Sequence, residues 1–268
     1  MGVEVTDERV AAAAARLHHG GWWFTSRQLY YAVCADVETP PLRVAGAEIG
    51  FGLVLVLVGI ITGHRTALII TGALGLLLVV VGAATYIQER RPLPPTRPLA
   101  LSFVDFEGRF LSADARYQGL VGLVAPPSLA ATPEAAIVIC DRAQTAAFLV
   151  ANRERVGDVE VLVHGDHQRD LTAIRVVVIH DCDPAGCAVA ADLRDRGADV
   201  ADAGINPPEL AGRRLQLIEG APARLPRDLS GHLDADAAKW LLSGRRFELA
   251  TQSPEELVTR VRAALSQG

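Results

Sequence analysis

The second half of the chain alternates short apolar runs with segments whose apolar positions recur at helical spacing. The runs are rich in β-branched residues and predict four strands, at Ala136–Cys140, Val159–Val163, Arg175–His180 and Asp199–Ala203. Helical periodicity predicts helices between them, over Gln144–Arg155 and Cys187–Arg196. Regular strand–helix alternation of this kind predicts an α/β fold, a four-stranded parallel sheet with flanking helices on both faces.

Further helices are predicted on either side of this region. Near the N-terminus, Thr6 to His19 is alanine-rich with Thr6 as its N-cap, and a second helix begins at Thr25 or Ser26 and runs towards Val37. The segment Leu101 to Val124 has an amphipathic helical pattern. Near the C-terminus, a helix is predicted around Asp234 to Leu242, and a last one begins at about Pro254 with Ser253 as its cap.

The most apolar part of the chain runs from Val44 to Tyr86. Its only charged residues are Glu48 and Arg65, and the latter separates two uncharged stretches. A helix needs about 20 residues to cross the hydrocarbon core of a bilayer. We therefore predict a transmembrane hairpin of two helices within residues 44–88. The alternative is a buried helical hairpin in a soluble protein.

Basic residues predict how this hairpin is oriented. They lie on both sides of it, and the turn between its helices carries only one, Arg65; the flanking ones are Arg27, Arg43, Arg90, Arg91 and Arg97. The positive-inside rule then places both termini in the cytoplasm, as in a multi-pass protein of the cell membrane. The stretch is not read as a signal peptide, because a polar segment precedes it and no cleavage pattern follows.

These patterns divide the chain into five parts. We expect cytoplasmic N-terminal helices in 1–43, two transmembrane helices in 44–88, a linker with an amphipathic helix in 89–133, the α/β domain in 134–210 and a helical extension in 211–268.

Charge and cysteine content narrow the candidate functions. From Pro98 onward there are 18 Lys and Arg against 24 Asp and Glu, so the α/β part carries no bulk positive charge with which to neutralise phosphates. Nucleic-acid binding would need a local patch, a metal or a partner. The four cysteines lack the spacing of a zinc site and are expected to be reduced in a cytoplasmic chain.

Three carboxylates follow predicted strands. Asp141 follows the first strand, and Asp181 and Asp183 follow the third. In open α/β sheets, ligands bind beyond the carboxyl ends of the strands. If the first and third strands are neighbours, the three side chains converge on one Mg²⁺, whose preferred ligands are oxygens. The alternative is a solvated acidic turn.

Two neighbours of these acids are candidates for contact with phosphate. Arg142 is either a phosphate ligand or one half of a surface ion pair. His180 is either a phosphate contact or simply a connector residue.

The sequence Asp181-Cys182-Asp183-Pro184-Ala185-Gly186 resembles the Asp-x-Asp-x-x-Gly element of the Toprim domain, which topoisomerases, primases and some nucleases share. In that family an acidic residue also follows the first strand. Asp141 stands in that position, where the family usually has Glu. The resemblance implies a Toprim-like sheet, a Mg²⁺ site made by Asp141, Asp181 and Asp183, and a catalytic role for Asp141.

Within that family, the chain looks most similar to the topoisomerase VI A subunit and its meiotic break-forming relatives. Arg27-Gln28-Leu29-Tyr30-Tyr31 resembles their Arg-x-x-Tyr-Tyr motif. The resemblance implies that Tyr31 attacks a DNA phosphodiester while Arg27, one helical turn away, polarises the phosphate. It also implies DNA as a ligand, a partner ATPase subunit and a homodimer. The predicted hairpin departs from the family, in which the tyrosine lies in a larger winged-helix domain.

Several functions remain open. Tyr31 is either the nucleophile or, with Trp22, Trp23, Phe24 and Tyr30, part of an aromatic cluster at the membrane interface. Three classes of protein therefore stay open. The first is a membrane-anchored, Mg²⁺-dependent enzyme that cleaves DNA. The others are a degenerate Toprim module that binds nucleotide or nucleic acid without catalysis, and an interaction protein.

Overall fold

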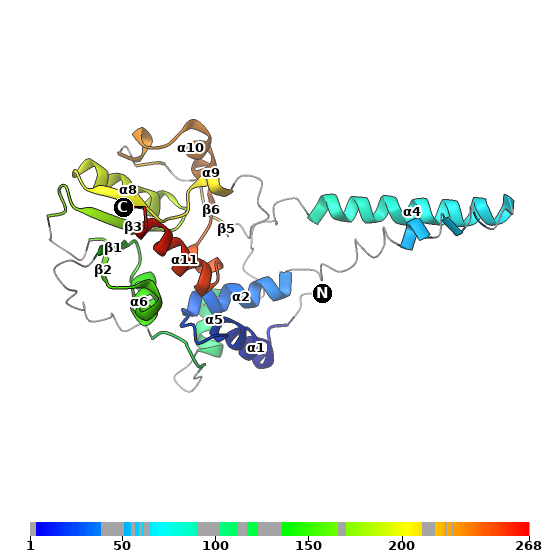
Figure 1. The fold of residues 1–268 in the computed structure, drawn as a ribbon, viewed down its shortest axis with the longest axis horizontal. Helices are drawn as coiled ribbons and strands as arrows, with labels where there is room; N and C mark the ends of the chain where they lie inside the picture. The colour runs from blue at the N-terminus through cyan, green and yellow to red at the C-terminus, as the bar shows by residue number, and fades with distance from the viewer. Residues whose placement is uncertain are drawn as a thin grey trace. The chain divides into compact units, whose positions relative to one another are not determined.

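The computed structural model describes residues 4–38, 51–54, 57–58, 61, 65–89, 102–111, 117–122, 136–165, 170–210, 218–222, 224–226 and 228–267 (Figure 1). These residues fall into two compact units. One contains the N-terminal helices, the sheet and the C-terminal segment. The other contains α4 (Arg65–Glu89) and the described residues between 51 and 61.

A four-stranded parallel sheet forms the centre of the first unit. Its order is β2-β1-β3-β4, and the strands are β1 (Ala136–Cys140), β2 (Val159–Val163), β3 (Arg175–Ile179) and β4 (Asp199–Asp202). The register pairs Cys140 of β1 with Ile179 of β3. The predicted α/β fold with a parallel four-stranded sheet is therefore confirmed, and the first two strands have their predicted bounds.

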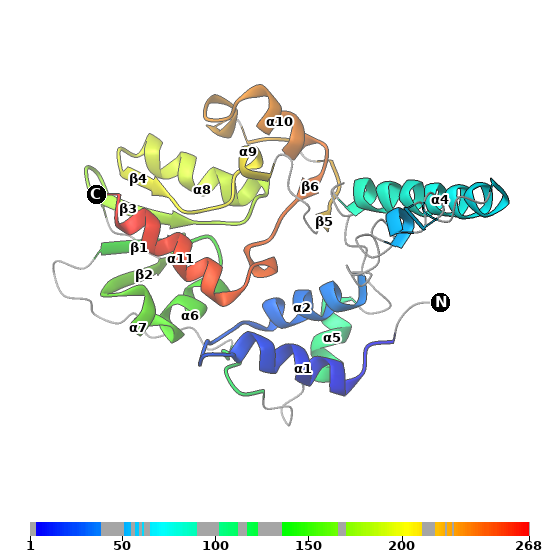
Figure 2. The ribbon, with the colours of Figure 1, turned by 45° about the vertical axis from the view of Figure 1, so that its right-hand side comes forward.

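Helices cover both faces of this sheet (Figure 2). They are α6 (Ala143–Ala151), α7 (Arg153–Val156), α8 (Pro184–Asp195) and α11 (Pro254–Leu265). The connections from β1 to β2 and from β3 to β4 run in opposite directions across the sheet. Right-handed crossovers therefore place α6 and α8 on opposite faces. Ile139 and Val178 lie side by side in the register and belong to the same buried cluster as Val189 and Leu193 of α8.

The N-terminal helices pack together beside the sheet. They are α1 (Asp7–His18), α2 (Ser26–Glu38) and α5 (Phe103–Phe110). Tyr30 makes edge-on contacts with Phe103 and Phe106, with ring centroids 5.4 Å apart in each pair. Asn152, at the end of α6, accepts a hydrogen bond from the Trp23 N–H and donates one to the Trp23 carbonyl, both 3.1 Å long.

For Phe24, Tyr30 and Tyr31, this packing argues against the membrane-interface interpretation. Phe24, Tyr30 and Tyr31 are buried in the same unit as the sheet, and among the side chains of Trp22 to Tyr31 only that of Trp23 is largely exposed, at 44 %. These rings contribute to the hydrophobic core of the protein.

The predicted caps are confirmed at both ends of the chain. The Thr6 hydroxyl accepts a hydrogen bond from the Arg9 N–H at the start of α1. Ser253 and Glu256 form a complete capping box at the start of α11.

The C-terminal segment contains more short elements than the sequence pattern indicates. They are α9 (Pro207–Leu210), β5 (Ile218–Glu219), η1 (Asp228–Gly231), α10 (Ala235–Leu242), β6 (Arg245–Arg246) and η2 (Leu249–Thr251). Strands β5 and β6 pair antiparallel and were not predicted.

The helix predicted over Leu101 to Val124 is wrong in its extent. Helix α5 ends at Phe110, and residues 117–122 are not helical. Their backbone pairs instead with Phe24, which donates its N–H to Gly119 and accepts from Val121, at 2.8 and 2.9 Å. Gly119 has a φ of +83°, which ends any helix there.

No helix in the described part of the chain is both long enough and apolar enough to cross a membrane. The two transmembrane helices predicted within 44–88 are therefore not confirmed. Residues 44–50, 55–56, 59–60 and 62–64 of that prediction lie outside the described residues, as do 90–101, 112–116 and 123–133 of the predicted linker.

Candidate functional site

The acidic residues that follow β1 and β3 meet at one edge of the sheet. Strands β1 and β3 are neighbours, and the chain leaves them in opposite directions, so this edge is the topological switch point of the sheet. The Asp181 N–H donates a hydrogen bond to Asp141 Oδ2 over 2.9 Å. The structure thus brings Asp141 and Asp181 together, as the sequence predicts.

Asp183 belongs to the same cluster and also caps a helix. Its Oδ1 accepts a hydrogen bond of 2.7 Å from the Gly186 N–H at the start of α8. The glycine is required here because a Cβ on Gly186 would collide with the Asp181 carbonyl and lie 3.2 Å from Asp141 Oδ2. Because Gly186 has no side chain, the Asp181 backbone and the Asp141 carboxylate can both lie close to the start of α8.

Arg142 contacts all three carboxylates. Its Nε lies 2.6 Å from Asp181 Oδ2 and 4.0 Å from Asp141 Oδ2, and a terminal nitrogen lies 3.4 Å from Asp183 Oδ2. The ion-pair interpretation of Arg142 is confirmed, although the pair lies at the site and the Arg142 side chain is only 34 % exposed.

Burial and mutual repulsion raise the pKa values of two of these acids. For Asp181, burial and then the negative charge of Asp141 raise the pKa to about 7. Burial also raises the pKa of Asp141, against the hydrogen bond from the Asp181 N–H. The buried Oδ1 of Asp141 has no hydrogen-bond partner. The cluster holds more negative charge than Arg142 alone neutralises.

A fourth carboxylate, Glu248, is brought to this site from the C-terminal segment. Cys182 and Phe247 exchange two backbone hydrogen bonds, of 2.8 and 3.1 Å, and the Leu249 N–H donates to Asp181 Oδ1 over 2.7 Å. Glu248 lies between these anchors. Sequence reasoning missed it because the pairing is tertiary; the only local signal is the apolar–charged–apolar order of residues 247–249.

Glu248 contacts both Tyr31, the predicted nucleophile, and Arg27. Arg27 Nη1 lies 3.0 and 3.2 Å from the two carboxylate oxygens of Glu248, and the same carboxylate is hydrogen-bonded to the Tyr31 side chain. Arg27 and Tyr31 therefore share one face of α2, as their spacing predicts. Burial and the negative charge of Glu248 raise the pKa of Tyr31 far above its ordinary value.

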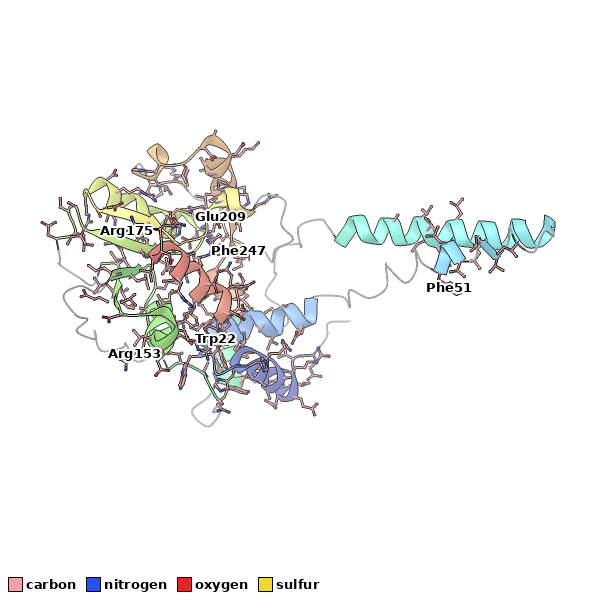
Figure 3. All side chains as sticks on the ribbon, viewed as in Figure 1. Trp22, Phe51, Arg153, Arg175, Glu209 and Phe247 are labelled. Atoms are coloured by element: carbon pink, nitrogen blue, oxygen red, sulfur yellow. The ribbon has the colours of Figure 1, made fainter. Side chains whose placement is uncertain are left out.

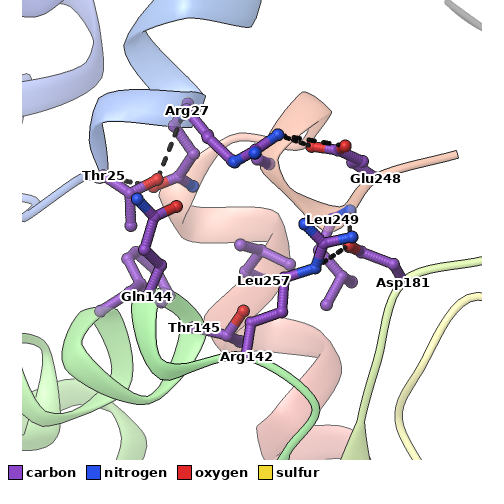
Figure 4. A pocket seen from close by; sticks show the side chains of 12 residues that line it. Thr25, Arg27, Arg142, Gln144, Thr145, Asp181, Glu248, Leu249 and Leu257 are labelled. Carbon is purple, nitrogen blue, oxygen red and sulfur yellow. Dashed lines mark hydrogen bonds and ion pairs between the residues drawn. The ribbon is translucent and has the colours of Figure 1, made fainter. Parts of the chain in front are cut away.

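A pocket opens between α2, the start of α6 and the C-terminal segment (Figure 4). It encloses about 350 Å³ of space, part of it open to solvent. Its charged lining is Arg27, Arg142, Asp181 and Glu248, and Phe148, Leu249, Ala250 and Leu257 form an apolar part. No side chain caps the N-terminus of α6, whose first turn contributes Gln144 and Thr145 to the lining. Tyr31 is not among the lining residues.

His180 is not among the residues that line this pocket. Its side chain is completely buried, and Nε2 lies 3.2 Å from Asp202 Oδ1 while Nδ1 contacts the Asp181 carbonyl at 2.7 Å. The Cys187 thiol is hydrogen-bonded to His180 and Cys182. The phosphate-contact interpretation of His180 is therefore wrong, because the imidazole is held inside the fold by Asp202.

The three carboxylates have suitable donor atoms for the predicted Mg²⁺ site, but they are not arranged around a metal position. Three carboxylates, with two buried oxygens that have no hydrogen-bond partner (Asp141 Oδ1 and Asp181 Oδ2), have the donor chemistry that Mg²⁺ prefers. Among the described residues, however, no three Asp, Glu, His or Cys side chains are grouped as a metal ion would require. Arg142 instead occupies the position between the carboxylates.

Comparisons with protein-family models, with curated proteins and with solved structures find no match for this chain. The resemblance to Toprim proteins therefore rests on the residues described above and on the sheet that carries them.

Proposed function

We propose that this chain is a Toprim-like protein that binds a nucleic-acid phosphodiester together with Mg²⁺ at the carboxyl edge of its sheet. The observation that carries the proposal is a pocket lined by Arg27, Arg142 and Asp181. Asp141 contacts Asp181 beside this pocket, and Asp183 contacts Arg142. Carboxylates would hold the metal, and arginines would pair with phosphate oxygens. The uncapped N-terminus of α6 adds N–H groups and a favourable dipole for an anion.

We propose the following roles for these residues in a cleavage step. Mg²⁺, when bound, would neutralise charge that develops on the phosphate and leaving oxygens. Glu248 is placed to accept the proton of Tyr31, whose oxygen would then bond to phosphorus while the bond from phosphorus to the sugar oxygen breaks. The leaving oxygen takes a proton from water. Because Tyr31 is only 7 % exposed and Arg27 covers Glu248, we propose binding as the primary function and cleavage as conditional on Arg27 moving to phosphate.

Metal-dependent binding of nucleic acid tests the primary function. Fluorescence anisotropy would follow labelled single- and double-stranded oligonucleotides with the full chain, in Mg²⁺ and in EDTA. We expect binding that requires Mg²⁺ and is lost when Asp181 and Asp183 are both changed to Asn. Asp199→Asn removes one carboxylate at the amino end of β4, away from the cluster, and should bind as the wild type does. Equal oligonucleotide binding in Mg²⁺ and in EDTA would refute the proposal. So would unchanged binding by the variant in which Asp181 and Asp183 are both Asn.

A separate observation favours attachment of the second unit to lipid. Its described leucine, valine, isoleucine and phenylalanine side chains are widely exposed, whereas Gly52, Gly75 and Gly82 are buried. A Cβ on Gly52 would approach the Gly75 carbonyl to 2.8 Å, so the two segments pack closely through glycine. Phe51 is one of the outward-facing side chains (Figure 3). Small residues inside and large apolar residues outside are typical of helices in lipid.

Alkaline carbonate extraction of cell membranes tests this attachment. We propose that the full chain stays in the membrane pellet, with its nucleic-acid site on the cytoplasmic side. Release of the folded chain into the supernatant would contradict lipid attachment without affecting the proposed site.

A further inference from the structure

The Arg142 guanidinium lies against the carboxylates of Asp141, Asp181 and Asp183, the position that a shared metal ion would occupy. It follows Asp141 directly and is the N-cap residue of α6, so its backbone is fixed at the end of β1. From there its guanidinium approaches Asp181 most closely, at 2.6 Å, and also lies near Asp183 and Asp141. The carboxylates are nearly buried, with side-chain exposures of 4 % for Asp181, 7 % for Asp141 and 16 % for Asp183.

A guanidinium and a divalent metal would need the same oxygen atoms here. Oδ1 of Asp181 is already committed to the Leu249 N–H, and Oδ2 of Asp141 to the Asp181 N–H. Three oxygens are left for a metal. Asp141 Oδ1 has no hydrogen-bond partner, Asp181 Oδ2 has only the ion pair with Arg142, and Asp183 Oδ2 has only its contact with Arg142. A metal ion on Asp181 Oδ2 or Asp183 Oδ2 would lie against the Arg142 guanidinium, and two cations that close together in a nearly buried site repel each other strongly.

The pocket provides space into which the Arg142 side chain can move. It is partly exposed and lines the pocket, across which Glu248 lies. Glu248 already acts on Arg142 electrostatically. A guanidinium that leaves Asp181 therefore enters the space in which the phosphate of the proposed ligand would bind.

We infer that Arg142 is a built-in competitor of the divalent cation, which must displace it from Asp181 to bind. This inference rests on the proposed metal site and adds to it: bound metal and the Arg142–Asp181 ion pair exclude each other. Removal of the guanidinium should therefore tighten metal binding, whereas removal of an ordinary supporting residue would weaken it.

Binding of Mn²⁺ alone to the full chain tests the inference, with free Mn²⁺ counted by electron paramagnetic resonance. Arg142→Gln should bind Mn²⁺ about tenfold more tightly than the wild type, which corresponds to about 1.4 kcal/mol that the metal no longer spends on displacing the guanidinium. Arg175→Gln removes the same charge at the amino end of β3 and should leave Mn²⁺ affinity unchanged. Arg142→Lys keeps the positive charge but lacks the planar guanidinium with its several N–H donors. Its Mn²⁺ affinity should lie between those of the wild type and Arg142→Gln.

Thermal unfolding provides a second readout. Without metal, Arg142→Gln should melt below the wild type, because the three carboxylates lose the guanidinium that pairs with them. Mn²⁺ should raise the melting temperature of Arg142→Gln more than it raises that of the wild type. If Arg142→Gln does not fold without metal, Arg142→Lys carries the same comparison.

The outcomes separate the inference from the proposed function. Equal or weaker Mn²⁺ binding by Arg142→Gln, with binding by the wild type, overturns the inference and leaves the metal site standing. Absence of Mn²⁺ binding from both proteins overturns both. Tighter binding that persists when Asp181→Asn is added to Arg142→Gln places the metal elsewhere and also overturns the inference.

Discussion

The Leu249 N–H donates a hydrogen bond of 2.7 Å to Oδ1 of Asp181, although the two residues are 68 positions apart. This contact fixes the C-terminal segment against the acidic edge of the sheet. It explains why Asp181 is both buried and highly connected, and why Glu248 reaches α2. Stability and site geometry therefore depend on the same carboxylate.

Two substitutions of Asp181 should differ in their effect on stability. Asp181→Ala removes the acceptor of the Leu249 N–H and the closest partner of Arg142, and should lower the free energy of unfolding by about 3–5 kcal/mol. Asp181→Asn keeps an acceptor oxygen and removes repulsion with Asp141, so it should cost clearly less. Urea denaturation at neutral pH measures both. Equal losses would show that the hydrogen bond to Leu249 contributes little.

Replacement of Gly186 should damage the site and the fold together. Its Cβ would collide with the Asp181 carbonyl, so Gly186→Ala should destabilise the protein by about 1–3 kcal/mol, as overpacking generally does. It should also weaken Mn²⁺ binding, because Asp141 must shift. Gly108→Ala is the matched control, since nothing surrounds the Cβ position of Gly108 in α5, and it should be neutral or stabilising. Full stability of Gly186→Ala would contradict the tight approach of the loop.

The Tyr31 phenol should stay protonated in alkaline solution. Burial and Glu248 raise its pKa well above the ordinary value of 10.0. Ultraviolet titration of tyrosinate to about pH 11 should therefore give the same curve for wild type and Tyr31→Phe, because the phenols that ionise there are elsewhere in the chain. A wild-type curve that exceeds the variant's by one tyrosinate would show that Glu248 does not hold the proton on Tyr31.

Asp202 should contribute acid sensitivity to the fold. Burial raises its pKa, but the hydrogen bond and charge of His180 outweigh burial and lower it to about 2. A depressed carboxyl pKa stabilises the fold above the unfolded value of 3.8, and this contribution is lost as pH falls towards 2. It amounts to about 2 kcal/mol.

Denaturation by urea at pH 6 and at pH 3 measures this loss. We expect the difference in unfolding free energy between the two pH values to be smaller for Asp202→Asn than for the wild type. Asp199→Asn, whose side chain is 63 % exposed, should match the wild type. An unchanged difference for Asp202→Asn would mean that the His180 pair does not control acid stability.

Much of the sheet could be predicted from local sequence, because β-branched runs and caps act locally. Val159–Val163, the Thr6 cap and the Ser253 capping box are direct examples. The neighbouring positions of Asp141 and Asp181 followed from one topological assumption, that β1 and β3 are adjacent. The helix beyond Phe110 failed because backbone pairing with Phe24, a distant residue, overrode its amphipathic pattern.

The rest of the site depends on contacts that no local pattern records. Glu248 reaches the pocket only because Cys182 pairs with Phe247. Arg142 follows Asp141 in sequence, but its position among three carboxylates requires β3 to lie beside β1. His180 looked available for phosphate until burial beside Asp202 removed it.

Anomalous X-ray scattering from Mn²⁺ in crystals of the full chain tests the central claim most directly. We predict one Mn²⁺ peak, strongest in Arg142→Gln, about 2 Å from carboxylate oxygens of the Asp141–Asp181–Asp183 cluster, with the wild-type Arg142 turned into the pocket wherever metal is bound. A peak elsewhere, or none in either protein while the three carboxylates keep their positions, would contradict it.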